Sequence, residues 1–297
     1  MIHREIQAQS HLFIPSGKES EGRILHLLLR FYRLASLVAV NLCREKKYSE
    51  FVSKLYEAEF GTRSKHGLEA PRIILKDGTT VSFNGKVDRV DTYRKDGKMY
   101  IRVVDYKTGS KSFSLDDIRQ GYSIQLLLYL FAVCDTKSEY FKKLIGCEQG
   151  DVLTPAGAIY LSMAIPKLKC NVNDSEESVL SAASHEIKRS GLLLNHSDTL
   201  RAMNNQFDSD ILAGIYVHAK DGSLKGKALT DEETFSLLRE ELGQTICHIA
   251  SEIKSGNANA YPTMHNGVLA CTYCEMKPFC RVDKMKESDK KEKENER

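Results

Sequence analysis

Two tight-turn signals in one stretch of the chain limit its possible folds more than any other feature. Residues 70–109, "APRIILKDGTTVSFNGKVDRVDTYRKDGKMYIRVVDYKTG", contain two Asp-Gly pairs, each between runs rich in β-branched and aromatic residues. Asp-Gly between such runs is the strongest short-range signal for a β-hairpin. We therefore expect three antiparallel strands, at about 71–76, 80–93 and 98–106.

Helical patterns lie on both sides of these strands. Apolar residues on most turns predict a helix over residues 22–47, followed by a shorter helical run that ends near Glu59. After the strands, Ser114 and Asp117 resemble a capping box, which predicts a helix that continues to about Asp135. The strands are therefore expected to pack against at least one helix before them and one after them.

The second half of the chain adds one strand and one long helix to this order. "AGAIYLSMAI", residues 156–165, is the best later strand, and residues 231–256 predict a helix with an acidic first turn and a terminal glycine. Residues 171–185 are polar and are interpreted as an inserted or mobile segment. The expected core order is helix, three strands, helix, strand, an α/β (α+β) arrangement.

Composition is typical of a soluble globular protein of one large domain or two modest ones. The 297 residues are 41% hydrophobic and 28% charged, and the net charge is only +3. A nucleic-acid partner would therefore have to be held by local basic patches. No apolar stretch is expected to reach the roughly 18 residues of a membrane span, and "MIHREIQAQS" lacks a signal peptide. These features predict a cytoplasmic protein without membrane contact, whose eight cysteines are thiols or metal ligands.

An acid and a lysine stand two residues apart at the end of the third predicted strand, in "VVDYKTG". Side chains alternate along a strand, so Asp105 and Lys107 point to one face and Tyr106 to the other. Asp88 in "GKVDRVD" lies across the hairpin, so its carboxylate can meet that of Asp105 near the strand ends. Two carboxylates and a backbone carbonyl, here that of Tyr106, make a hard-oxygen site suited to Mg²⁺. An ordinary strand end with a surface ion pair is the alternative.

The helix after these strands carries two polar residues on an otherwise apolar face. Gln125 and Tyr129 are four residues apart and therefore share a face. If they are buried they need polar partners, and a simple hydrogen-bonded contact in the core remains the alternative to a functional role. Asp91 is interpreted as structural or as the partner of Arg89.

A cysteine triplet stands near the end of the chain. Cys271, Cys274 and Cys280 follow a C-x₂-C-x₅-C pattern. A metal site built from thiolates usually has four ligands. A zinc ion would take His265 as the fourth ligand, whereas an iron–sulfur cluster would take a distant cysteine. Three reduced thiols are the remaining alternative. The other cysteines after residue 100 stand singly and are interpreted as ordinary small residues: Cys134, Cys147, Cys170 and Cys247.

"GKVDRVD", "VVDYKTG" and "QLLLYL", in this order and on these elements, resemble the PD-(D/E)XK nuclease superfamily, in the branch of RecB-type and Cas4-type nucleases. The resemblance implies a restriction-endonuclease-like core, with a mixed central sheet flanked by helices. It also implies that Asp88 and Asp105 are metal ligands and that Lys107 is the catalytic lysine. Gln125 and Tyr129 match the QxxxY motif of this branch.

Members of the same branch hold a 4Fe–4S cluster with three late cysteines and one that precedes the nuclease core. The resemblance therefore implies a cluster on the cysteine triplet. The fourth ligand is uncertain, because the only upstream cysteine is Cys43, which lies within a helix and later than expected. His26 in "GRILHLLL" superficially fits an early family position near the metal, and Glu57 matches an acid that the family carries before its sheet. A structural role is the usual one for such a lone histidine.

From about Gly22 to Asp283 the chain resembles the nuclease domains of AddB-type subunits, which act with an AddA-like helicase–nuclease partner on DNA ends. The resemblance implies cutting of unwound single strands during recombinational repair. Such subunits carry a helicase-like region ahead of this domain, and no GxxxxGK[ST] phosphate loop occurs here, so the chain is expected to be a fragment. The alternatives are a catalytically silent DNA- or partner-binding remnant and a free-standing Cas4-like exonuclease.

The expected organisation has three parts. Residues 1–20 form an irregular amino-terminal segment, and residues 21–282 form the nuclease domain with its cysteine cluster. Residues 283–297 have almost no apolar content and are expected to form a disordered charged tail.

Overall fold

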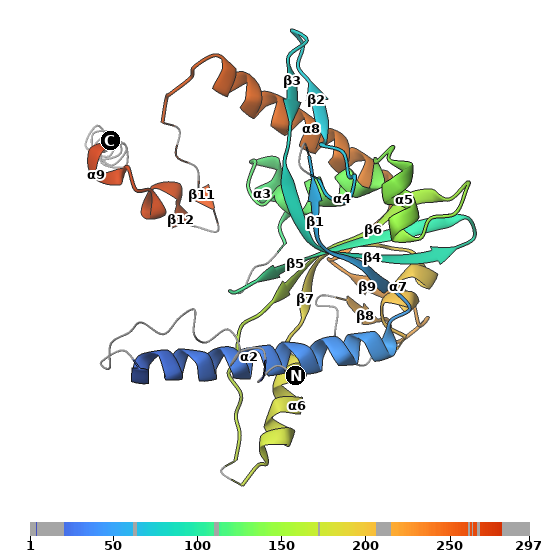
Figure 1. Ribbon diagram of the computed structural model, residues 1–297, viewed down its shortest axis with the longest axis vertical. Coiled ribbons are helices and arrows are strands. Elements are labelled where there is room, and N and C mark those ends of the chain that lie inside the picture. Colours follow the sequence, from blue (N-terminus) through green and yellow to red (C-terminus); the bar gives the residue numbers. More distant parts are fainter. Residues whose placement is uncertain are drawn as a thin grey trace.

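A mixed sheet of six strands forms the centre of the molecule (Figure 1). The computed structural model describes residues 4, 21–61, 64–109, 113–171, 173–205, 215–260, 262, 264–265 and 268–280. The strand order is β1 (Val52–Phe60), β4 (Gly85–Lys95), β5 (Lys98–Lys107), β6 (Val152–Ser162), β7 (Arg189–Leu194) and β10 (Leu229–Thr230). β5 runs parallel to β6 and β7 parallel to β10, whereas the other neighbours are antiparallel.

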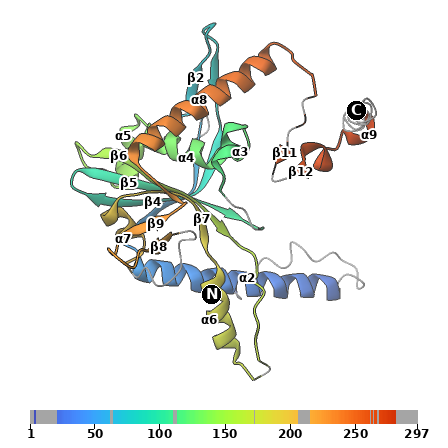
Figure 2. The same ribbon diagram turned by 180° about the vertical axis from the view of Figure 1, so that it is seen from behind.

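Helices cover both faces of this sheet. One side carries α3 (Leu115–Arg119), α4 (Gln125–Cys134), α5 (Glu139–Ile145) and α8 (Glu232–Lys254), and the other carries α2 (Glu21–Tyr48) and α6 (Glu176–Glu186), as Figures 1 and 2 show. The short helix α7 (Ser197–Met203) follows β7. Two small hairpins stand outside the sheet, β2 (Arg72–Ile74) with β3 (Thr80–Ser82), and β8 (Ile215–Val217) with β9 (Leu224–Gly226).

The carboxy-terminal part of the described chain forms a separate segment. It consists of β11 (Met264–His265), β12 (Val268–Leu269), the 3₁₀ turn η3 (Ala270–Tyr273) and α9 (Lys277–Cys280). Figures 1 and 2 both draw this segment apart from the sheet and from α2. Its cysteines are consequently described on their own below.

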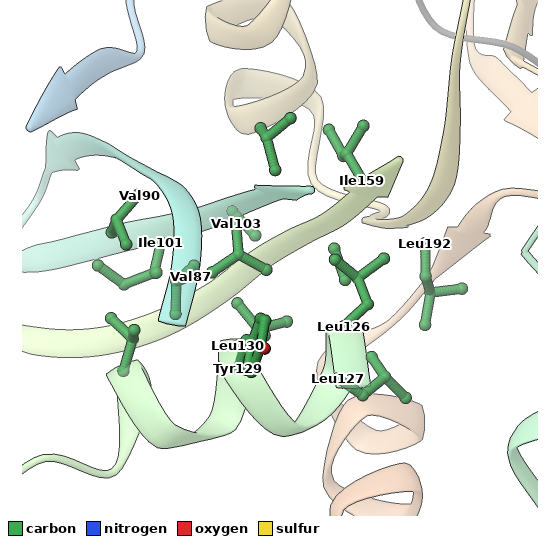
Figure 3. Packing of buried hydrophobic residues seen from close by; sticks show 14 of the residues in the cluster. Val87, Val90, Ile101, Val103, Leu126, Leu127, Tyr129, Leu130, Ile159 and Leu192 are labelled. Carbon is green, nitrogen blue, oxygen red and sulfur yellow. The ribbon is translucent and has the colours of Figure 1, made fainter. Parts of the chain in front are cut away.

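The main core lies between the sheet and α4. Figure 3 shows Leu126, Tyr129 and Leu130 of α4 on the side of the strands. Five side chains of β4, β5 and β6 that are at most 1% exposed fill the other side: Val87, Val90, Ile101, Val103 and Ile159. Burial of these apolar side chains fixes the start of α4 against the end of β5, which is where the polar residues of interest lie.

The strands at residues 72–107 confirm the predicted antiparallel series, with one change. The second predicted strand is two: β3 ends at Ser82 and β4 begins at Gly85. A Cβ on Gly85 would lie 2.6 Å from the Phe60 ring, so only glycine fits where β4 starts beside β1. The Asp96-Gly97 turn has positive φ at both residues, as a two-residue hairpin requires.

Three element predictions were wrong. The helical run that was expected to end near Glu59 is β1, because its pairing with β4 overrides the weak local pattern. The helix expected over residues 114–135 is broken into α3 and α4 at Gly121 and Ser123, which both have positive φ. The polar segment 171–185 contains the helix α6. The amino-terminal segment, except Arg4, and the charged tail lie outside the described residues.

The helix α2 confirms the helix predicted over residues 22–47. Residues Gly22–Tyr48 are long and apolar enough to cross a membrane by length and composition alone, which corrects the expectation of no such stretch. The second half of the helix is nevertheless built into the domain, since Leu37, Asn41 and Glu45 are buried. Asn41 donates to the backbone carbonyls of Ser184 and Ile187, which fixes α2 against α6.

Candidate active site

Asp105 and Lys107 form an ion pair at the end of β5. The Lys107 Nζ lies 2.6 Å from Asp105 Oδ2, and the side chains are 29% and 5% exposed for the lysine and the aspartate. The two residues thus share a face, as strand alternation predicts, while Tyr106 points to the opposite face and contacts Arg89. A buried carboxylate beside a partly exposed ammonium is therefore presented at the open end of the strand.

Tyr160 of β6 lies beside this pair. It is the partner of Asp105 in the β5–β6 register, and the Lys107 Nζ lies 5.8 Å from the centre of its ring. Burial raises the pKa of Tyr160 to about 12, and the carboxylates of Asp105 and Asp117 add to the shift. The phenol therefore stays neutral at physiological pH and offers Lys107 an aromatic face.

The carboxylate of Asp88 on β4 accepts a hydrogen bond from the backbone of Tyr106 on β5. The ladder between β4 and β5 ends at Arg89 and Val104, and beyond it the Tyr106 backbone N–H donates to Asp88 Oδ2 at 2.8 Å. Continuing the register by one step pairs Asp88 with Asp105. The carboxylate of Asp88 thus takes the place of a backbone acceptor where the two strands separate.

The oxygen atoms gathered here fit a hard divalent cation. The N–H and C=O of one strand residue point to the same side, so the Tyr106 carbonyl faces β4 and Asp88. The next carbonyl, that of Lys107, accepts from Met163 N on the β6 side. Asp88, Asp105 and the Tyr106 carbonyl would supply three oxygen ligands, and Mg²⁺ ordinarily keeps several waters besides. Within the described residues, no three His, Cys, Asp or Glu side chains form a closed metal cluster.

Gln125 and Tyr129 are joined directly to one another. The Gln125 side-chain amide donates to the Tyr129 hydroxyl, across one turn of α4. Tyr129 is buried and its ring meets Phe60 edge-on at 5.4 Å, whereas Gln125 is exposed at the first turn of the helix. Tyr129 is thus fixed in the core under β1, and Gln125 is held at the rim of the same region.

A buried cluster of charges lies behind the site, on the side of α2. Glu45 of α2 contacts arginines from three strands: Arg89, Arg102 and Arg189. Arg89 and Arg102 also bind Asp91, at 2.9 and 2.6 Å. The prediction that Asp91 pairs with Arg89 is confirmed.

The arginines keep Glu45 ionised despite its burial. Burial alone would raise the pKa of Glu45, but the charges of Arg189, Arg102 and Arg89 outweigh it and hold the pKa well below its usual range. Burial also lowers the pKa of Arg189, which lies deepest in the cluster. A buried carboxylate of this kind contributes to folding only while its cationic partners are in place.

The remaining candidates are not gathered at this site. His26 is exposed on the amino-terminal half of α2, and Glu57 pairs with Lys86 on the exposed side of β1. Glu57 nevertheless lies close to Asp88 in the β1–β4 register, and its φ of 54° is unusual for a residue within a strand.

The cysteine triplet lies in the separate carboxy-terminal segment. Cys271 is partly exposed, and Cys274 and Cys280 are exposed. Cys43 is exposed on α2, which Figures 1 and 2 place apart from the segment, and the His265 side chain lies outside the described residues. The described segment therefore offers three thiols to a metal or cluster. Cys134 and Cys147 are partly buried, and burial raises the pKa of both thiols.

Sequence reasoning missed Glu45 and Tyr160. Glu45 stands in "CREKKY", where a charged helix end needs no special explanation, and its arginine partners are up to 144 residues away. Tyr160 interrupts the apolar run "AGAIYLSM", and that single polar tip in a buried strand was the available signal.

Comparisons with known proteins support this arrangement. Residues 7–281 match the PD-(D/E)XK nuclease superfamily. A protein of Acetivibrio thermocellus, named as a subunit of an ATP-dependent helicase/deoxyribonuclease, is 29% identical over 90% of this chain and 23% of its own length. Proteins of the same name from Clostridium acetobutylicum and Clostridium kluyveri are 29% and 33% identical, over 96% and 82% of this chain and 24% and 20% of their own. The chain therefore spans about a fifth to a quarter of the length of these relatives.

Proposed function

Because the chain belongs to the PD-(D/E)XK nuclease superfamily, we propose that it is a Mg²⁺-dependent deoxyribonuclease domain that cuts single-stranded DNA. The observation that carries the proposal is the Asp105–Lys107 pair, which stands beside an Asp88 carboxylate held by the Tyr106 amide. An ordinary surface ion pair would not need a second carboxylate, here that of Asp88, held beside it by the backbone of the same strand. The names of the similar proteins support DNA as the substrate.

Each residue has a defined part in this proposal. Asp88 and Asp105, with the Tyr106 carbonyl, would hold Mg²⁺. The ion would polarise a phosphoryl oxygen and lower the pKa of an attacking water. Lys107 would stabilise negative charge on the phosphate or orient the attacking water, and the face of the Tyr160 ring would support its ammonium. Gln125, which is exposed, would contact the DNA backbone, and the support for this role is that the Tyr129 hydroxyl holds its side-chain amide.

The biological setting follows from the names of the relatives. They are subunits of a helicase/deoxyribonuclease. We propose that this domain acts in the cytoplasm with an AddA-like helicase–nuclease partner, on strands unwound at DNA ends. The cysteine triplet would carry an iron–sulfur cluster, with zinc as the alternative.

Replacing Lys107 by methionine tests the catalytic assignment. Lys107→Met should lower the rate of cutting of a single-stranded oligonucleotide by about 100-fold or more, because a charge aimed at the reacting phosphate is lost. Binding of the same oligonucleotide should change little, and chelation of divalent ions should stop cutting by the wild-type chain. The assay is the appearance of shortened end-labelled DNA over time.

Lys98 provides the matched control. It lies at the other end of β5 and forms an exposed ion pair with Glu232 at 2.9 Å. Lys98→Met removes the same charge from the same strand and should keep the wild-type rate. Equal cutting by the Lys107→Met and wild-type chains would reject the proposed site, and a wild-type chain that binds DNA without cutting it would favour the catalytically silent alternative.

A further inference from the structure

Tyr106 links the buried charge cluster to the candidate metal ligands. Its side chain lies on the α2 side of the sheet, where its hydroxyl accepts from Arg89 Nη1 at 3.2 Å and its ring centre lies 6.0 Å from that guanidinium. Its backbone N–H donates to Asp88 on the other strand. One residue therefore contacts both the cluster and a proposed ligand of the metal.

Arg89 is a rigid anchor for this contact. Its side chain is only 3% exposed, and its Nη2 donates to Glu45 at 3.1 Å and to Asp91 at 2.9 Å. Its Nε also donates to Asp91, at 3.2 Å. Because these carboxylates hold the guanidinium from two sides, the Nη1 that meets Tyr106 has a fixed direction.

The peptide around Tyr106 has fewer restraints toward β4. The ladder with β4 ends two residues earlier, at Val104. On the β6 side the Lys107 carbonyl accepts from Met163 N at 2.7 Å, which holds the strand but does not orient Asp88. The contact of the Tyr106 side chain with Arg89 therefore restrains this part of β5 on the side of the charge cluster.

We propose that Tyr106 is a positioning residue that sets the affinity of the site for Mg²⁺. Through its hydroxyl contact with Arg89, Tyr106 fixes the stretch of backbone whose N–H orients Asp88 and whose next carbonyl, its own, points toward β4. Partners that orient the ligands of a metal typically contribute 10- to 100-fold to its affinity. The inference rests on the proposed function, since it takes the Asp88 and Asp105 site as the place where Mg²⁺ binds.

Tyr106→Phe is the decisive variant, because it removes one oxygen atom and keeps the ring. Binding of Mg²⁺ to the chain without DNA is measured by titration calorimetry, and cutting of single-stranded DNA is measured over a series of Mg²⁺ concentrations. The dissociation constant and the half-saturating Mg²⁺ concentration should both rise by about 10-fold. The rate at saturating Mg²⁺ should stay within about 2-fold of the wild type, because no reacting group is lost.

Tyr93→Phe is the matched control. Tyr93 lies on β4 and packs on the rings of Phe51 and Tyr100, away from Arg89 and Asp88. It should leave the Mg²⁺ affinity unchanged. Melting temperatures without Mg²⁺ verify that both variants fold, and Tyr106→Leu, which removes the ring as well, should weaken Mg²⁺ binding at least as much as Tyr106→Phe.

The outcomes separate this inference from the proposed function. Equal Mg²⁺ affinity in the wild type, Tyr106→Phe and Tyr106→Leu overturns the inference while the nuclease activity stands. A wild-type chain that binds Mg²⁺ without cutting DNA overturns the proposed activity alone, and the affinities still decide the role of Tyr106. A lower saturating rate with unchanged affinity also overturns the inference, since the hydroxyl would then act on the reaction and not on the metal.

Discussion

Glu45 joins α2 to three strands, and its ionisation should make the stability of the domain depend on pH. Glu45→Gln should lower the free energy of unfolding at pH 7 by about 3 kcal/mol, because Arg89 and Arg102 then share only the charge of Asp91 and Arg189 loses that of Glu45. The pKa of Glu45 in the folded chain is lowered from its usual 4.5, so its contribution is complete above that value. As the pH falls further the contribution is lost, and the difference between variant and wild type should shrink.

Denaturant unfolding at several pH values, from neutral to well below the usual pKa of a glutamate, measures this difference. Glu240→Gln is the control, since Glu240 is exposed on α8 and lies in no charge cluster that the structure describes. A Glu45→Gln penalty that is constant across this range would mean that Glu45 contributes through its shape and not through its charge.

Single residues also show how far the sequence could be interpreted. Asp105, Lys107 and Asp88 could be placed together because strand alternation and hairpin geometry are local rules. The Arg89–Asp91 pair was predicted for the same reason, as the two residues are close in sequence. Glu45 and Tyr160 could not be placed, because their contacts come from elements that meet only in the folded sheet.

At the scale of elements, the break between α3 and α4 decides where Gln125 stands. Ser123 has a φ of 54°, which L-residues with a side chain adopt only at a cost of roughly 1 kcal/mol. Ser123→Gly should therefore stabilise the domain, by about 0.5 to 1 kcal/mol, and leave DNA cutting unchanged. Thermal denaturation of the variant and of the wild type measures the effect.

The control is a serine with helical backbone angles, for which substitution by glycine should lower the stability. Ser236 is exposed within α8, so Ser236→Gly should destabilise the domain by about 0.5 to 1 kcal/mol. If both variants lose stability alike, the positive φ at Ser123 carries no strain, and the side chain contributes by its contacts instead.

The failed element predictions have a common physical cause. β1 contains Leu55 and Ala58, whose spacing suits a helix as well as an irregular strand, and only its pairing with β4 settles the choice. The helix α6 packs mainly on α2, so most of its surface is free to be polar. Local periodicity cannot show which neighbour an element has.

At the scale of the whole molecule, the cysteine triplet lies in a segment apart from the sheet, so its metal content can be tested separately from the Mg²⁺ site. Anaerobic purification followed by iron and sulfide analysis should give about four of each per chain if the cysteine triplet and a fourth ligand hold a cluster. Cys274→Ser should lower the iron content strongly, because a thiolate ligand is lost. Cys247→Ser, on α8, is the control and should keep it.

The metal found in this experiment also decides between alternatives. One zinc ion in place of iron would favour the zinc alternative for the segment. A chain without either metal would contradict a metal role for the triplet. Cys43→Ser tests the fourth position in the same assay, since it lowers the iron content only if Cys43 is a ligand.

The contacts of α2 impose an order of events during synthesis on the ribosome. Asn41 takes its partners from Ser184 and Ile187, and Glu45 takes one of its three arginines, Arg189, from the same stretch, 143 to 146 residues later. At 5–20 residues per second, α2 waits roughly 7 to 30 s before those partners leave the ribosome. Throughout that delay the face of α2 that the folded domain buries, which includes Leu37, is exposed to water and to other nascent chains. The nascent protein should therefore depend on chaperones that bind apolar helices, and this demand ends when β7 joins the sheet.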